Sequence, residues 1–200
     1  MAENKQLVGG LRAAARDAVR QQLADVAIDL ISERGFDGVT VEQIASAAGV
    51  SVRSVHRYFP AKEDMVVGGL SAYGSVVRDA LLERPQDEPI LKSLEAAYGA
   101  MLSTRPQTER DKIAVRLLAD APSLHARNAE KHLDWAALLE PIVADRLIGL
   151  DIDLRAKVLV GVSISTFSSA LTVWAQPGET RDVREVLGAA FATLRSLDAA

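Results

Sequence analysis

The sequence predicts an all-α protein in which a small N-terminal helical unit precedes a larger helical bundle. Apolar residues recur at intervals of three and four along most of the 200 residues, which is the spacing of one face of a helix. No segment alternates apolar and polar residues as a half-buried strand would. Residues that break helices separate the periodic segments from one another. They are Pro85, Pro89, Pro106, Pro122, Gly149, Pro177 and Gly178.

The first predicted helix runs from about residue 12 or 16 to Arg34. Gly35 follows it where a left-handed C-terminal cap is expected, because glycine adopts that backbone conformation without steric cost. The apolar face of this helix consists of Leu23, Val26, Ala27, Leu30 and Ile31.

Two short helices follow, and their boundaries can be read from capping residues. Thr40 and Gln43 have the spacing of a capping box, so a helix should begin at Val41. Gly49 permits the sharp turn that ends this helix, and Ser51 can cap the next one. Two short helices joined by so tight a turn predict a helix-turn-helix.

The second short helix has an apolar side and a cationic side. Val55 and Phe59 are four residues apart and should face inward, which turns Arg53 and Arg57 outward. A short arginine-rich helix by itself is more often a solvated face. Together with the two caps and the turn, the pattern instead favours a recognition helix whose arginines read base edges in a major groove. Ser54 and His56 flank the two arginines, and Ser54, Tyr58 and Lys62 suit phosphate contacts that fix the register.

The remaining segments predict further helices, with a longer one linking the N-terminal unit to the bundle. Pro141 lies inside one segment, where it should kink or split the helix. The predicted ranges are about 61–82, 90–103, 108–120, 123–148, 153–175 and 181–197.

Composition and charge exclude several classes of protein. There is no cysteine, so disulfide frameworks, thiolate nucleophiles and cysteine-based zinc sites are excluded. The pattern shows neither a signal peptide nor a membrane span, and a soluble cytoplasmic protein is expected. The net charge is −4, but residues 1–62 hold eight Lys and Arg against seven Asp and Glu. Any argument for DNA binding must therefore rest on local placement of charge.

The segment "RQQLADVAIDLISERGFDGVTVEQIASAAGVSVRSVHRYFPAKEDMVVGGL" resembles the DNA-binding domain of the TetR family of bacterial transcriptional regulators, over about residues 12–70. The resemblance rests on the Gly-Phe before Thr40, the Ile-Ala-x-x-Ala-Gly-Val-Ser core, the Tyr-Phe ending and the Lys-Glu-Asp start of the next helix. The chain departs from the family at Arg53-Ser54-Val55-His56, where members often carry a Gly-Thr-Leu-Tyr-like run.

The resemblance implies a DNA-binding domain over residues 1–60 and an effector-binding and dimerisation domain over residues 61–200. It implies that phosphate contacts fall on Thr40, Ser51, Ser54, Tyr58 and Lys62. Positions near base edges fall on Val52, Arg53, His56 and Arg57.

The last two predicted helices, about 155–175 and 181–197, are candidates for a homodimer interface. One carries a strip of small residues that would permit close helix approach, and the other an apolar face. From the pattern alone both could equally cap the core of one chain, and the resemblance favours dimerisation. The small strip is Gly161, Ser165, Ser168 and Thr172; the apolar face is Val183, Val186, Leu187, Ala190, Phe191 and Leu194.

An effector site is predicted among large side chains on neighbouring helices, with Arg116 and Asp120 as a polar pair that could orient a mainly apolar ligand. The commoner interpretation of such a pair is an ion pair between helices. His125, Asn128 and His132 align on one helix face, which indicates a polar strip more strongly than a metal site. The large side chains are Tyr98, Met101, Trp135, Phe167 and Trp174.

Together with these patterns, the resemblance implies a ligand-responsive repressor that binds a palindromic operator in double-stranded DNA as a homodimer. A small apolar or amphipathic effector would release it, with no membrane, metal or cofactor involved. One alternative is a helical interaction or dimerisation module without ligand response. The other is a small helical enzyme, against which stands the absence of nucleophile-elbow, dinucleotide-binding and phosphate-loop motifs.

Overall fold

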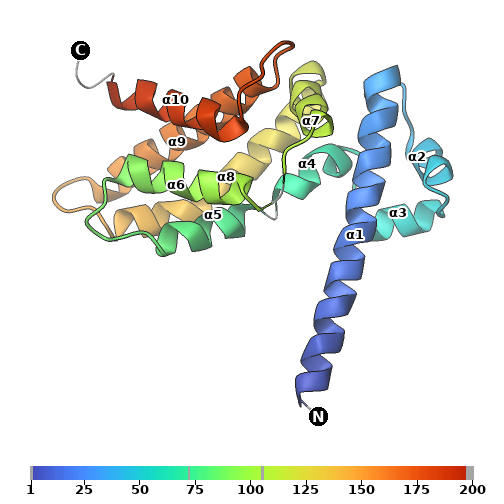
Figure 1. The fold of residues 1–200 in the computed structure, drawn as a ribbon, viewed down its shortest axis with the longest axis horizontal. Helices are drawn as coiled ribbons and strands as arrows, with labels where there is room; N and C mark the ends of the chain where they lie inside the picture. The colour runs from blue at the N-terminus through green and yellow to red at the C-terminus, as the bar shows by residue number, and fades with distance from the viewer. Residues whose placement is uncertain (1, 72, 105, 197–200) are drawn as a thin grey trace. The chain divides into compact units, whose positions relative to one another are not determined.

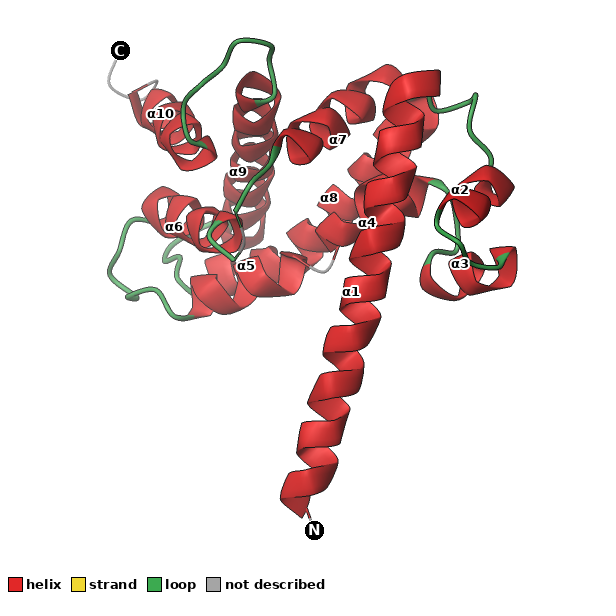
Figure 2. Ribbon diagram, turned by 45° about the vertical axis from the view of Figure 1, so that its right-hand side comes forward, coloured by secondary structure: helices red, strands yellow, loops and turns green. Residues whose placement is uncertain are grey.

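The computed structural model describes residues 2–71, 73–104 and 106–196, and their side chains except those of residues 2–14, 68–71 and 120. All regular secondary structure in this part of the chain is helical, which confirms the predicted class (Figure 2). The chain divides into two compact units, Met1–Gly69 and Leu70–Ala200. The functional division at residue 60 stays a prediction.

The N-terminal unit is built on one long helix and three short ones. Helix α1 (Ala2–Arg34) begins well before the predicted start, and its N-terminal half extends beyond α2 and α3 (Figure 1). It ends at Gly35, whose φ of 77° confirms the left-handed cap. Helices α2 (Val41–Ala47) and α3 (Val52–Tyr58) follow, and α4 (Glu63–Ser71) closes the unit.

The core of the N-terminal unit joins the C-terminal half of α1 to the two short helices. Ile31 of α1, Ile44 of α2 and Val55 of α3 are fully buried. Phe59, the C-cap residue of α3, is buried beside them, so the inward face predicted for Val55 and Phe59 is confirmed. Because each short helix contributes few apolar residues, α1 supplies most of the surface that holds them.

The described residues of the C-terminal unit form a bundle of six helices. Helix α9 packs on α8 and α10, α5 packs on α6 and α8, and α7 lies against α8 and α9. The bounds are α5 Tyr73–Leu82, α6 Ile90–Leu102, α7 Glu109–Asp120, α8 Pro122–Ala144, α9 Ile152–Trp174 and α10 Val183–Ser196.

Two predicted helices differ from those observed. The segment 61–82 was expected to be one helix and is described as α4 and α5, on either side of residue 72. Helix α8 continues through Pro141 and is not split there; the proline lies in the last turn of the helix, which ends three residues later at Ala144. That end also precedes the predicted one at residue 148.

The apolar face of α10 belongs to the core of its own chain. Val183, Val186, Leu187 and Phe191 are buried, and Phe191 has no exposed surface. Their aromatic and aliphatic surface packs with α6 and α9. Of the two interpretations of this face, capping the core is therefore correct for these four residues. Only the opposite side of α10 is available to a partner.

Candidate nucleic-acid interface and effector-binding residues

The helix-turn-helix is held by caps at the start of both short helices. Thr40 Oγ1 accepts a hydrogen bond from the Gln43 amide at 3.3 Å, and Gln43 Oε1 accepts one from the Thr40 amide at 3.0 Å. Ser51 Oγ accepts the Ser54 amide hydrogen bond at 3.1 Å. Gly49 has a φ of 68°, a conformation that favours glycine. The capping box, the turn and the serine cap are all confirmed.

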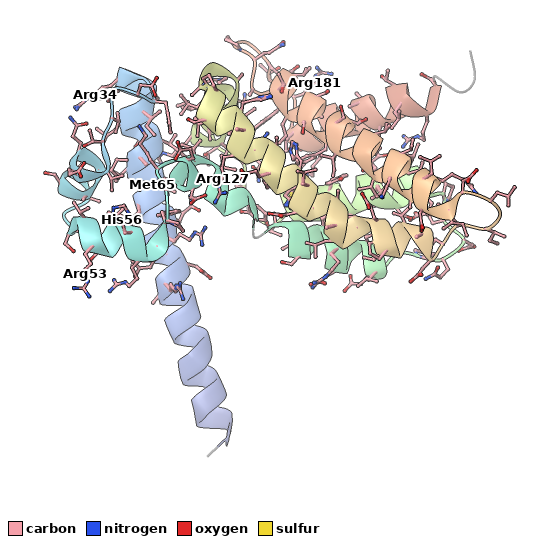
Figure 3. All side chains as sticks on the ribbon, turned by 180° about the vertical axis from the view of Figure 1, so that it is seen from behind. Arg34, Arg53, His56, Met65, Arg127 and Arg181 are labelled. Atoms are coloured by element: carbon pink, nitrogen blue, oxygen red, sulfur yellow. The ribbon has the colours of Figure 1, made fainter. Side chains whose placement is uncertain are left out.

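The outward side of α3 is cationic. Arg53, His56 and Arg57 are exposed, while Val52, Ser54 and Tyr58 are half-buried beside them. Figure 3 shows Arg53 extending from α3 away from the rest of the N-terminal unit. The Arg57 guanidinium lies 5.1 Å from the centre of the Tyr58 ring. The predicted base-edge residues therefore gather on one short exposed helix.

Of the predicted phosphate contacts, Thr40 and Ser51 cap α2 and α3 through their side-chain oxygens, and Ser54 Oγ in the first turn of α3 lies 2.9 Å from Ser51 Oγ. One of the two serine hydroxyls donates to the other, so the second keeps its proton for a phosphate oxygen. Nearby, a hydrogen bond with its own backbone and one with Thr40 lower the pKa of the Glu42 carboxyl, and His56 adds a smaller effect. An ionised Glu42 beside α3 limits how closely a phosphate can approach there.

Lys62 has a role that the sequence did not predict. Its Nζ donates to Phe36 O at 2.7 Å and to Val39 O at 2.8 Å, and it lies 4.0 Å from the centre of the Phe36 ring. The ammonium group thus ties the start of α4 to the loop between α1 and α2. One of its three N–H groups remains for a phosphate, so the predicted DNA contact is combined with a structural role.

Most of the predicted effector-binding side chains lie together in the core of the C-terminal unit. Tyr98, Trp135 and Phe167 form an aromatic cluster in which the Tyr98 and Phe167 ring centres are 4.7 Å apart. The Tyr98 hydroxyl lies 3.1 Å from Ser163 Oγ, and burial raises the pKa of this phenol well above its usual range. Met101 and Trp174 are buried in the same core cluster.

Of the predicted polar pair, the structure describes the side chain of Arg116 alone. Arg116 Nη1 donates to Ala175 O at 2.6 Å, so its guanidinium caps the C-terminal end of α9. The side chain of Asp120 lies outside the described residues. The described partner of Arg116 is thus a backbone carbonyl, and its pairing with Asp120 stays a prediction.

Helix α8 contains a buried polar group that sequence reasoning missed. Lys131 is only 4% exposed, and among the described residues its ammonium has neither a hydrogen bond nor an ion pair. It lies 5.1 Å from the centre of the Trp135 ring, and burial lowers its pKa to about 8. The side-chain oxygen Asn128 Oδ1 and the indole nitrogen of Trp135 are also buried without a partner. Lys131 and Trp135 are four residues apart, which was the available signal.

The histidine strip on α8 is partly an interhelical contact. His132 Nε2 lies 3.3 Å from Ser168 Oγ of α9, and burial, with smaller effects of Lys131 and His125, lowers its pKa to about 4. His132 is therefore neutral at physiological pH. Within the described residues no group of three His, Cys, Asp or Glu is placed to hold a metal ion.

The outward face of α9 is apolar and exposed. Leu154, Val158 and Val162 are 61%, 53% and 38% exposed, and they follow one another at intervals of four residues. Gly161, Ser165 and Thr172 of the predicted small strip are exposed as well, whereas Ser168 faces α8. By length and composition alone, α9 is the one described helix that could cross a membrane. Its other face, with Val160 and Phe167, is part of the core of this unit.

Family models match both units of the chain. Residues 23–67 match the model of bacterial regulatory proteins of the tetR family, and residues 88–197 match the MftR C-terminal domain. The first match contains α2 and α3 with both caps. The second contains the aromatic cluster, Lys131 and the exposed face of α9.

Relatives and solved structures resemble the chain over most of its length. It is 27% identical to MftR of Mycobacterium tuberculosis over 179 residues, which cover 88% of this chain and 89% of the relative. It is 30% identical to the transcriptional regulator TcmR of Streptomyces glaucescens over 161 residues, which cover 76% and 71%. Its fold resembles FadR of Bacillus subtilis, crystallised with stearoyl-CoA, with a TM-score of 0.57, 19% identity and coverage of 86% and 96%.

Proposed function

The chain belongs to the TetR family of bacterial transcriptional regulators, and on that premise we propose that α3 reads a palindromic operator for a homodimer that an effector releases. The observation that carries the DNA-binding part is the exposed cationic side of α3. Arg53 and Arg57 project from a helix whose position is fixed by two caps and by buried Val55. Arginine in a major groove can pair with guanine through two hydrogen bonds.

The roles of the other residues follow from their positions around α3. We assign base-edge contacts to Val52, Arg53, His56 and Arg57. Thr40, Ser51, Ser54 and Tyr58 would fix the register through phosphates, with Lys62 as an additional contact. As a transcriptional regulator without a catalytic role, the protein would act in the cytoplasm, where its DNA is.

The dimer proposal rests on the exposed face of α9. A soluble chain rarely leaves a continuous apolar strip uncovered, and a second copy could cover it around a two-fold axis. On α10 the exposed Glu185, Ala189 and Ala192 would border this contact, since the buried side of α10 is committed to its own core. Such symmetry would place two α3 helices about 34–36 Å apart on one face of DNA, which requires a palindromic site.

The effector part is supported by the aromatic cluster of the C-terminal unit. Tyr98, Trp135 and Phe167 offer a mainly apolar environment, with Met101 and Trp174 in the same core. FadR of Bacillus subtilis, which shares the fold, is described in complex with stearoyl-CoA. We propose that an apolar or amphipathic molecule enters this region of the present protein. Because linkage is reciprocal, it would bind free protein more tightly than operator-bound protein.

Selection of genomic DNA fragments by the purified protein, followed by titration of the selected site, tests the DNA-binding proposal. Arg53→Ala and Arg57→Ala should each cost about 1 to 3 kcal/mol of specific binding and leave the helical content unchanged. Arg78→Ala, at an exposed ion pair on α5, is the matched control and should bind normally. Normal operator affinity in both α3 variants would remove the recognition role from this helix.

Sedimentation of Val158→Asp tests the dimer proposal. Val158 is 53% exposed, so a carboxylate there leaves the fold of one chain intact but would be buried in the proposed interface. The variant should sediment as a folded monomer at concentrations where the parent protein is a dimer. Leu82→Asp, at a 58% exposed position on α5, should leave the dimer unchanged. A dimeric Val158→Asp variant would place the interface elsewhere.

A further inference from the structure

We propose that Lys131, with the indole N–H of Trp135, binds the anionic head group of the effector, a carboxylate or a phosphate, while the aromatic cluster takes its apolar tail. This inference rests on the proposed function only in taking the bound molecule to be the effector. The observations that carry it concern one face of α8, where Asn128, Lys131 and Trp135 recur at intervals of three and four residues.

Two polar atoms on this face, beside the buried Lys131, have no hydrogen-bond partner among the described residues. A buried ammonium is costly unless an anion compensates it, and Lys131 has no ion pair or hydrogen bond among the described residues. The Trp135 indole nitrogen, a donor, and Asn128 Oδ1, an acceptor, are buried without a hydrogen-bond partner. Two further buried atoms without a partner in the described structure, Nε and Nη1, belong to Arg146, beyond the end of α8. Asn128 and Trp135 differ from Arg146 in sharing a helix face with a buried lysine, which indicates a place for a ligand.

The donors suit an anionic oxygen group. Lys131 supplies a positive charge with three N–H groups, and Trp135 supplies one further N–H. Neighbouring His132 is neutral at physiological pH because burial lowers its pKa to about 4, so Lys131 is the cation of this cluster. No acidic side chain among the described residues pairs with it. A carboxylate or phosphate could accept from both donors, whereas a neutral alcohol would leave the ammonium uncompensated.

The absence of a side chain at position 74 lets α5 approach the indole of Trp135 closely. Gly74 of α5 faces Trp135, and a Cβ at that position would lie 2.9 Å from the indole nitrogen. On its other side, Trp135 contacts Tyr98 and Phe167 in the aromatic cluster. Trp135 therefore borders both the donors proposed for the anionic head group and the rings proposed for the apolar tail, as an amphipathic anion requires.

Calorimetric titration of the full-length protein with octanoate, octyl phosphate and octanol tests the proposal, because the three probes share a tail and differ in head group. We expect at least one of the two anions to bind ten-fold or more tightly than octanol. The tighter anion identifies the head group as carboxylate or phosphate. If neither anion binds more tightly than octanol, the polar cluster holds only water or is purely structural, and the proposal is overturned.

The variant Lys131→Met tests whether Lys131 is the source of the preference for an anionic head group. It keeps a long side chain without the charge, and should remove the ten-fold preference for the anion while leaving octanol binding unchanged. Lys92→Met, at an exposed position on α6, should keep the preference. An anion preference that survives in Lys131→Met would overturn the proposed site. Operator binding is measured on the same samples: DNA binding without an anion preference would refute this inference alone, and the reverse would refute the DNA-binding proposal.

Discussion

Helices α3 and α8 both carry cations, but in opposite surroundings. On α3, Arg53 and Arg57 are exposed, and the caps around them satisfy the backbone. On α8, Lys131 is buried against Trp135 with no anionic partner in the described structure. Exposed cations stay hydrated, so they cost the free protein little stability before a phosphate binds. A buried, unpaired cation destabilises the free protein, and an anionic ligand would relieve that cost.

The comparison indicates that the two units recognise their partners by different means. The surface of α3 offers charge and hydrogen-bond donors in water, so its binding should depend strongly on salt. The cluster on α8 offers donors that have already lost their water, so its binding should depend on the shape and charge of one molecule. Variants at buried and exposed positions test how strongly burial changes the effect of a charge.

A charge placed in the core of the C-terminal unit should have the largest effect. Phe191→Asp replaces a fully buried ring that lies 6.1 Å from Tyr98, and leaves both a cavity and a buried carboxylate. We expect a loss of about 4 kcal/mol or more in the free energy of unfolding. Urea unfolding followed by circular dichroism measures it. A folded monomer of normal stability would mean that Phe191 lies at a subunit interface.

Removing the buried charge of α8 should stabilise the free protein. The pKa of Lys131 is lowered from 10.5 to about 8, which corresponds to roughly 3 kcal/mol of cost, and the contact with Trp135 returns about 1 kcal/mol. Lys131→Met should therefore raise the free energy of unfolding by about 2 kcal/mol at pH 7. Lys92→Met serves as the exposed control and should change it little.

The stability that Lys131→Met gains over the parent protein should depend on pH, in a direction set by the lowered pKa of Lys131. Below pH 8 both folded and unfolded states carry the charge, so the whole cost is present. As pH rises from about 8 toward 10.5, the folded state releases the proton first, and the parent protein gains stability. The advantage of Lys131→Met should shrink between pH 8 and 9.5 in the same unfolding experiment. A constant advantage across this interval would show that the ammonium is not desolvated.

Lys62 separates a structural cation from a DNA-binding one. Its ammonium donates to the carbonyls of Phe36 and Val39, so Lys62→Ala should lower the free energy of unfolding by about 1 to 2 kcal/mol without DNA present. If its third N–H also contacts a phosphate, the salt dependence of operator binding should fall by about one phosphate contact. Unchanged stability with a reduced salt dependence would assign Lys62 to DNA alone.

The cap of α3 should give the smallest effect. Ser51→Ala removes the hydrogen bond from the Ser54 amide and should cost about 1 kcal/mol of stability, with some loss of operator affinity. Ser51→Asp restores an acceptor for that amide and should recover the stability. It should not recover DNA binding, because its negative charge repels phosphate. Recovery of both would exclude a phosphate contact at Ser51.

Much of the N-terminal unit could be predicted from residues that lie close together in the sequence. The capping box at Thr40, the turn at Gly49, the cap at Ser51 and the inward face of Val55 depend on residues within a few positions of one another. Interactions of short range leave a pattern in the sequence. The start of α1 was missed because Gly9 and Gly10 are residues that usually interrupt a helix, whereas α1 continues through both.

Contacts between distant residues were not predictable from sequence in this way. Lys62 meets carbonyls 23 and 26 positions earlier, and Arg116 caps α9 at a carbonyl 59 positions later. Neither contact has a local signature. The same holds for α10, whose apolar face could equally have met a second chain or its own core.

Periodicity, caps and turns act over a few residues. The helical class, the helix-turn-helix and the cationic side of α3 could therefore be predicted from the sequence. Only the tertiary structure decided which apolar faces are buried within one chain and which stay exposed, as α10 and α9 show. It also decided that Lys131 is buried without a partner. The physical reason is that burial depends on the packing of helices far apart in the chain, which determines where water is excluded.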